Sequence, residues 1–257
     1  MIYYYWVAFY GIFRKEIKRF MRIWIQTLLP PAITTMLYFL VFGTVMGPRI
    51  GDMEGFNYTV FITPGLIMLA VIVNSYSNVV SSFYGARFVR SIEELLVSPV
   101  PNWLMVAGFS LGGVTRGVLT GLIVFGISRC FVVLHIEHLA LSLLLLILCS
   151  TIFALAGLLN GIFAKKFDDL VVVPTFILTP LIYLGGVFFS INSLRPIWQK
   201  LSYLNPVHYL IDLFRYSLLG IHPPESLTLG FSGIVLTGLI IYSLIMYLLQ
   251  RGQGLKT

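Results

Sequence analysis

Six long segments of the chain contain no Lys, Arg, Asp or Glu, and this feature limits the possible folds more than any other. The segments cover residues 23–48, 55–86, 95–115, 138–164, 170–194 and 226–250. Each reaches or exceeds the roughly 20 apolar residues that a helix needs to cross a hydrocarbon core of about 30 Å. Only 11% of the residues are charged, against roughly 25% in a soluble domain. The sequence therefore predicts an all-α integral membrane protein and excludes a soluble enzyme, a secreted disulfide-rich domain and a nucleic-acid binder.

The apolar segments predict six transmembrane helices, at residues 24–45, 58–80, 102–128, 139–160, 171–189 and 229–250. An even number of spans places both termini on one side. If that side is the cytoplasm, eleven basic residues face it and five face outside, while the acidic residues divide equally. This bias favours an N-in, C-in orientation, and it accounts for the net charge of +7.

The predicted spans divide the chain into four parts of one membrane domain, residues 1–257. Residues 1–23 form an interfacial helix, and residues 24–189 contain the first five spans. Residues 190–228 form an outer segment, and residues 229–257 contain the last span and a cytoplasmic tail. No stretch outside the spans is long enough for a second globular domain.

The N-terminal segment predicts an amphipathic helix in the cytoplasmic interface. Its basic residues lie within an arc of about 140° at 100° per residue. They are Arg14, Lys15, Lys18, Arg19 and Arg22. The opposite side carries the apolar residues Phe13, Ile17, Phe20, Met21 and Trp24. The helix is either a topology anchor alone or a docking surface for a cytoplasmic partner, and its length and two-sided character favour docking.

Between the second and third spans, residues 83–98 also predict a two-faced helix on the cytoplasmic side. Its charged face consists of Arg87, Arg90, Glu93 and Glu94. Arg90 precedes the two glutamates by three and four residues, a spacing at which ion pairs stiffen a helix. The charges form either a solvated face or a rigid element that a motor protein pushes, and the second interpretation is favoured.

The outer segment, residues 190–228, contains four prolines and five charged residues and is too interrupted to span a membrane. Its apolar stretches, residues 197–204 and 207–219, predict a pair of short helices that enter the outer leaflet and return. Such re-entrant backbone is tolerated only where protein or water satisfies its polar groups. Ordinary interfacial helices are the alternative.

Four polar residues in the predicted spans are candidates for a translocation path. They are Asn74, Asn78, Arg116 and Asn160. Helix-to-helix hydrogen bonding is the alternative role. An arginine inside a span is costly unless it faces protein or water.

Motifs for chemistry are missing from the sequence. There is no Gly-Lys-Ser or Gly-Lys-Thr phosphate-binding loop, so any ATP must be bound by another subunit. His135, Glu137 and His138 have no second cluster with metal-ligand spacing. No serine, histidine and acid form a nucleophile motif. We therefore expect no catalytic residue, no metal site and no cofactor in this chain.

Taken together, these segments resemble the membrane subunit of ABC-2 type transporters, over essentially the whole chain. The stretch IEELLVSPVP, residues 92–101, resembles the family's coupling helix, with Glu93 and Glu94 as the acidic pair. The most specific stretch is YLGGVFFSINSLRPIWQKLSYLNPVHYLIDLFRYSLLG, residues 183–220. Its motif residues are Gly185, Gly186, Asn205, Pro206, Tyr209 and Arg215. Val207 after the proline is an unusual choice for the family.

The resemblance implies a permease without enzymatic activity in a bacterial inner membrane. It further implies a homodimer that works with two copies of a separately encoded ABC ATPase, which binds ATP and Mg. Members of the family export drugs, lipids, polysaccharides and other amphiphiles, so the family does not identify the substrate.

Two other classes of function compete with this interpretation. An ATP-independent channel or ion-coupled carrier is the first, but a carrier usually needs an acid in the membrane, and the six predicted spans contain none. A membrane-embedded transferase would need a histidine or acid with a partner at one membrane face, and the sequence offers none.

Overall fold

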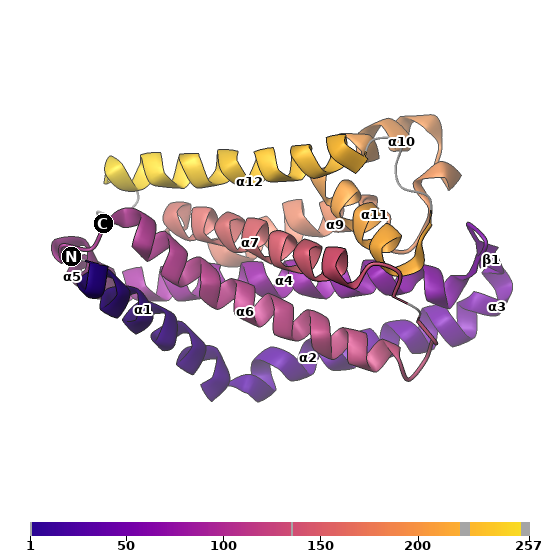
Figure 1. Cartoon of the computed structure of the whole chain (residues 1–257), viewed down its shortest axis with the longest axis horizontal. Coiled ribbons are helices and arrows are strands. Elements are labelled where there is room, and N and C mark those ends of the chain that lie inside the picture. The colour runs from indigo at the N-terminus through magenta and orange to yellow at the C-terminus, as the bar shows by residue number, and fades with distance from the viewer. Residues whose placement is uncertain (1, 135, 222–226, 253–257) are drawn as a thin grey trace.

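The computed structural model describes residues 2–134, 136–221 and 227–252, and Figure 1 shows a long bundle of roughly parallel helices. The first half contains α1 (Ile2–Arg22), α2 (Trp24–Tyr38), a π-helical stretch (Phe39–Met46), α3 (Gly47–Ile50), β1 (Asp52–Met53), β2 (Phe56–Asn57), α4 (Tyr58–Phe88), α5 (Ser91–Val97) and α6 (Asn102–Ser128). The second half contains α7 (Leu139–Phe163), α8 (Asp169–Val173), a π-helical stretch (Pro174–Leu178), α9 (Thr179–Leu184), a 3₁₀ turn (Ile191–Ser193), α10 (Pro196–Tyr203), α11 (Pro206–Leu219) and α12 (Leu227–Gln250).

Five helices of the described residues are long and apolar enough to cross a membrane. They are Trp24–Ile50, Tyr58–Phe88, Asn102–Ser128, Leu139–Phe163 and Gly230–Gln250. The prediction of an all-α membrane protein is confirmed, and the third span has the predicted bounds. The first span continues to Ile50 and the second to Phe88, so both are longer than predicted.

The predicted fifth span, residues 171–189, is shorter in the structure and runs over Asp169–Leu184. Sixteen residues reach about 24 Å at 1.5 Å per residue, less than the roughly 30 Å of a hydrocarbon core. The helix ends at Gly185 and Gly186, because Gly186 has a φ of +84° that helical backbone does not adopt. The observed helix is therefore shorter than the predicted fifth span, and both that span and the six-span topology stay predictions.

The core of the bundle is the packing of α4, α6 and α7, and glycines let these helices approach closely. A methyl group added at Gly117 of α6 would lie 2.9 Å from the Ser75 side chain of α4 and 2.9 Å from that of Ser150 of α7. A methyl group at Gly157 of α7 would lie 2.4 Å from the backbone oxygen of Tyr76. Small residues are a common means of close helix packing in membranes. The span containing α4 is accordingly 78% buried, whereas the span containing α2 is 17% buried.

The two ends of the bundle differ in what they carry (Figure 1). The start of α1, the end of α12 and the short helix α5 lie at one end, which we call the α5 end. The helix α10, the β1–β2 hairpin and α3 lie at the other, which we call the α10 end. This arrangement agrees with an even number of crossings, and the orientation in the membrane stays a prediction.

The helix predicted over residues 83–98 is divided in the structure. The first part belongs to α4, which ends at Phe88, and α5 begins at Ser91. Between them Arg90 adopts a left-handed backbone with φ of 58°, so the chain turns sharply there. The predicted single helix was wrong because the left-handed backbone at Arg90 interrupts it between α4 and α5.

The predicted outer pair of helices corresponds to α10 and α11. Their observed bounds, Pro196–Tyr203 and Pro206–Leu219, each differ from the predicted bounds by one residue. Residues 222–226 and 253–257 lie outside the described residues, so parts of the predicted outer segment and tail are not described.

Candidate functional site

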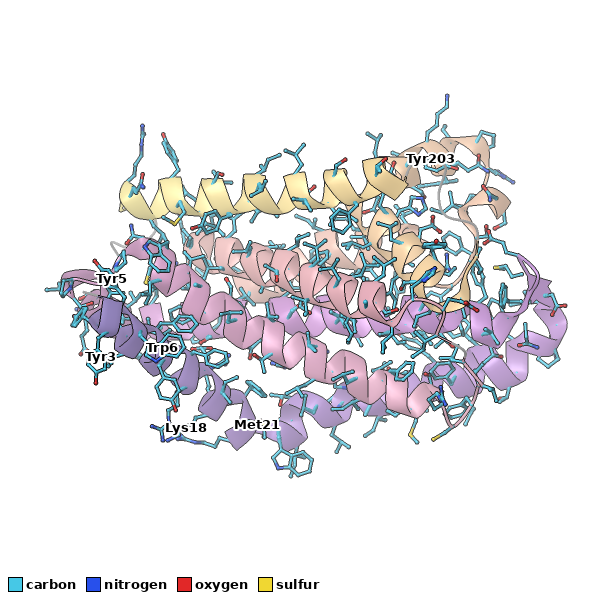
Figure 2. The ribbon with its side chains drawn as sticks, viewed as in Figure 1. Tyr3, Tyr5, Trp6, Lys18, Met21 and Tyr203 are labelled. Carbon is cyan, nitrogen blue, oxygen red and sulfur yellow. The ribbon has the colours of Figure 1, made fainter. Side chains whose placement is uncertain are left out.

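The helix α1 has three sides rather than the two predicted. Ile12, Glu16 and Phe20 pack against the bundle and are buried. Phe13 and Ile17 are half-buried and Met21 is exposed, on the side next to this packing face. Figure 2 shows Tyr3, Lys18 and Met21 at the outer edge of the bundle. Of the apolar stripe that the sequence identified, Phe20 therefore enters the packing face, and the other members border it or are exposed.

The five predicted docking residues of α1 divide into two groups. Arg14, Lys15, Lys18 and Arg22 are exposed, and Arg19 is half-buried because its side chain points at α4. The exposed residues are available to a partner, and Arg19 makes intramolecular contacts instead.

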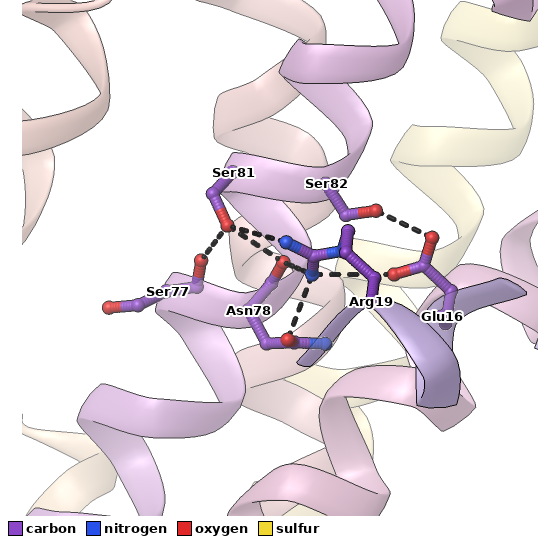
Figure 3. A network of polar contacts seen from close by, with 6 residues as sticks. All are labelled: Glu16, Arg19, Ser77, Asn78, Ser81 and Ser82. Carbon is purple, nitrogen blue, oxygen red and sulfur yellow. Dashed lines mark hydrogen bonds and ion pairs between the residues drawn. The ribbon is translucent and has the colours of Figure 1, made fainter. Parts of the chain in front are cut away.

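Arg19 joins α1 to α4 in the polar network of Figure 3. Its Nη2 donates to the backbone oxygen of Asn78 and to Oδ1 of the same residue, both at 2.8 Å. The same nitrogen lies 3.4 Å from Oε2 of Glu16, which is 0% exposed. Ser82 donates to Oε1 of Glu16 at 2.6 Å. The buried carboxylate is thus paired with a cation and a hydroxyl, as a buried charge requires.

Arg116 of α6 also donates to an asparagine of α4. This asparagine, Asn74, lies one helical turn before Asn78. Its Nη2 donates to Oδ1 of Asn74 at 3.0 Å and to the backbone oxygen of Thr27 at 3.3 Å. Asn74 and Asn78 are four residues apart, so they lie on one face of α4. The two asparagines therefore receive arginines from two different helices.

A cleft of about 290 Å³ lies between α2 and α4 next to Arg116. Its lining combines hydroxyl and amide groups with apolar side chains. The residues are Gln26, Thr27, Pro30, Pro31, Thr34, Thr35, Tyr38, Leu69, Ala70, Val73, Asn74, Ser77 and Arg116. Exposed polar residues on a spanning helix, here Gln26 and Thr34, favour contact with water or protein over contact with lipid.

The fourth predicted path residue, Asn160, lies elsewhere. It lines a cavity of about 390 Å³ between α4, α7, α9, α11 and α12, together with Tyr76 and Thr237. The other lining residues of that cavity are apolar. The structure therefore brings Asn74, Asn78 and Arg116 near one another and places Asn160 in a separate, apolar cavity.

The predicted coupling residues also occupy two environments. Arg90, Glu93 and Glu94 are exposed at the α5 end. The two glutamates lie in the first turn of α5, where acidic residues stabilise a helix. Arg87 belongs to α4 and is half-buried: its Nη1 donates to the backbone oxygens of Gly161 and Ile162 at 2.8 Å and of Ala164 at 3.1 Å. Arg87 therefore binds the last carbonyls of α7.

At the α10 end, Arg215 of α11 holds the outer motif together. Its side chain is buried, and Nη2 donates to the backbone oxygen of Gly186 at 2.7 Å. Asp212 lies 3.8 Å from Nη1, and the guanidinium stands 4.0 Å from the ring centre of Phe61 on α4. Burial raises the pKa of the Asp212 carboxyl, although Arg215 opposes the shift. Arg215 thus connects three elements: its own helix α11, the turn that follows α9, and α4.

Asn205 and Pro206 start α11. The side-chain oxygen of Asn205 accepts the backbone N–H of Val207 at 3.0 Å, which caps the helix, and Pro206 occupies its first position. The amide nitrogen of Asn205 donates to the backbone oxygen of Leu181 in α9 at 2.6 Å. The hydroxyl of Tyr209 donates to the backbone oxygen of Tyr203 at 2.8 Å, and this contact joins α11 to α10.

Gly185 and His208 complete this region. A methyl group at Gly185 would lie 3.0 Å from the Ile211 side chain and 3.1 Å from that of Val207, so glycine permits α9 and α11 to pack closely. Burial lowers the pKa of His208 to about 4, so the imidazole is neutral at pH 7. The structure brings all six predicted motif residues into one region.

Sequence reasoning missed Glu16, Ser82 and Phe61 as partners of these arginines. One signal was available for Glu16, because it lies four residues from both Ile12 and Phe20 and thus within the buried stripe of α1. Ser82 and Phe61 had no signal, since only folding brings them near residues far away in the chain. Among the described residues, no group of three or more His, Cys, Asp or Glu could hold a metal ion.

Comparison with known proteins assigns these features to a family. The family model described as ABC-2 type transporter matches residues 7–219. The chain is 53% identical to the inner membrane transport permease YadH of Escherichia coli (strain K12) over 258 residues, which cover 100% of both proteins. It is 24% identical to Nodulation protein J of Neorhizobium galegae over 247 residues, which cover 96% of this chain and 93% of that protein.

Proposed function

Because the chain belongs to the ABC-2 type transporter family, we propose that it is the permease subunit of an exporter driven by a separate ATPase. The chain is a membrane transporter subunit and a multi-pass protein of the bacterial inner membrane. Members of the family typically pair with an ATPase subunit. Export, the homodimer and the class of substrate are parts of the proposal.

The observation that carries the proposal is the placement of α5. Ile92 is 1% exposed and packs among residues of α1, α4, α6 and α7, so the short helix is fixed to the bundle. The next two residues, Glu93 and Glu94, are exposed at the α5 end. A helix that is anchored by one side and charged on the other can receive a force from a partner and pass it to the spans.

Arg87 supports transmission of that force. It lies three residues before Arg90, at the end of α4, and it binds three carbonyls at the end of α7. A displacement of α5 would therefore move the ends of α4 and α7 together. In this proposal Arg90, Glu93 and Glu94 contact the ATPase, and Arg87 links the contact to the core.

The exposed basic residues of α1 provide a second contact for the ATPase. Arg14, Lys15 and Lys18 are exposed on α1, and Arg22 ends the helix. Lys15 and Glu94 line opposite sides of one groove of about 310 Å³ between α1 and α5. A partner that enters this groove would meet both proposed contacts at once. The partner ATPase would bind ATP and Mg, for which this chain provides no phosphate-binding loop.

The exposure of the first span supports a homodimer with two ATPase subunits. The helix Trp24–Ile50 is 17% buried and carries the exposed polar residues Gln26 and Thr34. A polar face of this kind fits a second copy or a watery path better than lipid. We propose that an amphiphilic substrate such as a drug, a lipid or a polysaccharide passes between the two copies.

Charge reversal on α5 tests this function. In Glu93→Lys/Glu94→Lys we expect normal insertion, lost co-purification of the ATPase and lost ATP-driven transport, measured at matched expression. Removing two acids from a helix N-terminus costs roughly 0.3–1 kcal/mol each, which is small for folding. Glu93→Gln/Glu94→Gln removes the charges without adding repulsion and should give an intermediate loss. The matched control is Asp52→Lys/Glu137→Lys, because both residues are exposed and neither belongs to α5 or α1.

Retained coupling in the α5 variant would reduce this helix to a solvated connector. Transport by the purified permease without ATPase and nucleotide would favour the alternative, an ATP-independent channel or ion-coupled carrier.

A further inference from the structure

Within the described ranges of the chain, Arg116 has neither a carboxylate partner nor a helix C-terminus to bind, whereas each of the other arginines next to the core has one. Arg19 pairs with Glu16, Arg215 pairs with Asp212, and Arg87 binds the carbonyl end of a helix. Arg116 has only two neutral acceptors among the described residues, Asn74 and the backbone of Thr27. Its Nε is buried without an acceptor in the part of the chain that the structure describes, as is that of the other three arginines, so the missing carboxylate or helix end is what distinguishes Arg116.

A guanidinium in this state has unused capacity for an anion. It carries five N–H donors in a planar fork, and only Nη2 donates to described residues. A charge that has left water without a counter-ion is costly, and a bound anion would offset that cost. Phosphate, sulfate and carboxylate groups match the fork of arginine.

The cleft beside Arg116 is polar at one end and apolar at the other. The helices α2 and α4 run antiparallel, because Thr27 lies level with Asn74 and Gly43 lies level with Thr59. Gln26 and Ser77 therefore line the end at Arg116, and Tyr38 and Leu69 line the far end. The cleft fits a molecule with a polar head and an apolar tail.

The polar end lies beside the first turn of α2 and the middle of α6. Thr27 is in the first turn of the helix that starts at Trp24, whereas Arg116 lies near the midpoint of α6 and Asn74 near the midpoint of α4. The exposed basic residues Lys18 and Arg22 are on the adjoining part of α1 and attract anions toward this level.

We infer that Arg116 binds the anionic group of an amphiphile whose apolar part lies in the α2–α4 cleft toward Tyr38 and Leu69. This inference rests on the proposed function where it treats the amphiphile as the transported substrate. The anionic group is phosphate, sulfate or carboxylate, and it belongs to a membrane lipid or to a separate amphiphile.

The test measures binding to the full-length permease without ATPase, in nanodiscs of neutral phosphatidylcholine. Radiolabelled decyl phosphate is the probe for a separate amphiphile, and phosphatidic acid detected by native mass spectrometry is the probe for a lipid. Decyltrimethylammonium and decyl maltoside have the same tail without the anion and should not compete. If only decyl phosphate binds, the anionic group belongs to a separate amphiphile, and if only phosphatidic acid binds, it belongs to a lipid. Either result supports the inference.

Three substitutions decide the role of Arg116. Arg116→Gln keeps a donor for Asn74 and removes the charge, so affinity for decyl phosphate should fall about tenfold to hundredfold, the range for hydrogen bonds to a charged group. Asn74→Asp places a carboxylate beside Arg116, which should act as an internal counter-ion and lower affinity by at least about tenfold. The control Arg251→Gln removes the same charge from an exposed site on the C-terminal side of α12 and should leave affinity unchanged.

The inference is overturned if neither probe binds, if Asn74→Asp binds decyl phosphate like the unchanged chain, or if Arg251→Gln lowers binding as much as Arg116→Gln. Asn74→Asp keeps the test decisive even if Arg116→Gln fails to fold, because it removes no contact of Arg116. Because the ATPase is absent, failure of both probes to bind the unchanged chain refutes the anion site alone, whereas failure of the unchanged chain to co-purify with an ATPase refutes the proposed function.

Discussion

Replacing Arg87 by methionine should destabilise the permease and uncouple it from its ATPase without abolishing ATPase binding. Methionine has a similar length and helix propensity, so the change removes mainly the guanidinium. The three carbonyls at the end of α7, at 2.8, 2.8 and 3.1 Å from Nη1, then lose their shared donor.

The size of the effect follows from these contacts. A hydrogen bond to a charged group contributes about 1.5–3 kcal/mol, and one Nη1 has two hydrogens for three acceptors. A cation near a helix C-terminus adds about 0.3–1 kcal/mol. Arg87 is half-buried, so water replaces part of the loss. We therefore expect a decrease of about 2–4 kcal/mol in the free energy of unfolding, and about half of that decrease for Arg87→Lys, which keeps the charge but loses the fork.

Cys149 provides the assay. It is buried and Cys130 is exposed, so in a Cys130→Ser background a thiol-reactive dye labels the chain only when the core opens. The midpoint of labelling is followed in mixed micelles of increasing dodecyl sulfate. Co-purification with the ATPase and ATP-driven transport are measured on the same variants.

Arg90→Met is the matched control. Arg90 is exposed, so the variant should change the free energy of unfolding by less than about 0.5 kcal/mol but weaken ATPase binding. The reasoning fails if Arg87→Met unfolds like the unchanged chain, or if it loses the ATPase while its stability is unaffected. Either result would make Arg87 a surface docking residue.

Three further predictions use other contacts. Gly112→Leu should detach α1 from α6, because even a methyl group there would lie 2.6 Å from an α1 side chain. The expected result is increased protease cleavage of α1. Gly126→Leu is the control, because a methyl group there would have nothing within 4 Å, and equal cleavage of the two variants would contradict the packing. Single cysteines at Leu204, 81% exposed, and Val97, 87% exposed, should be labelled from the periplasmic and cytoplasmic sides respectively; labelling of both from one side would refute the proposed orientation. Asn205→Ala should lower the free energy of unfolding, measured from the dodecyl sulfate titration, by about 1–3 kcal/mol through loss of a helix cap and a buried hydrogen bond. Asn205→Asp keeps the cap and should lose less, and equal losses would show that the cap does not matter.

Composition and local sequence patterns are enough to predict most of the helices of this chain. A charge-free run long enough to cross the bilayer has few alternatives to a helix, so the third span has the predicted bounds and four others are recognised at or near theirs. Prolines end or start helices by local sterics, which is why α10 and α11 begin within one residue of the predicted positions. The family motifs are also local patterns, and they identified the family before any fold was known.

Tertiary structure alone decided which polar groups meet. Arg19 and Arg87 have the same sequence signature as exposed basic residues, but one contacts Asn78 and the other the end of α7. The partners of Arg215 include Phe61, far away in the chain. Periodicity gives the side of a helix on which a residue lies, but it does not give the neighbouring helix.

The bilayer stabilises any helix with a long enough apolar segment, whichever helices it packs against. Hydrophobic burial into lipid is nearly the same for every face of a spanning helix, so the packing depends on small residues and polar pairs. Gly117 and Gly157 let α4, α6 and α7 close on one another, and that closure brings Asn74 within reach of Arg116. Gly108 and Gly112 let α1 pack on α6, which brings Arg19 to Asn78. The candidate anion site therefore follows from the tertiary packing, whereas the residues that form it were already visible in the sequence.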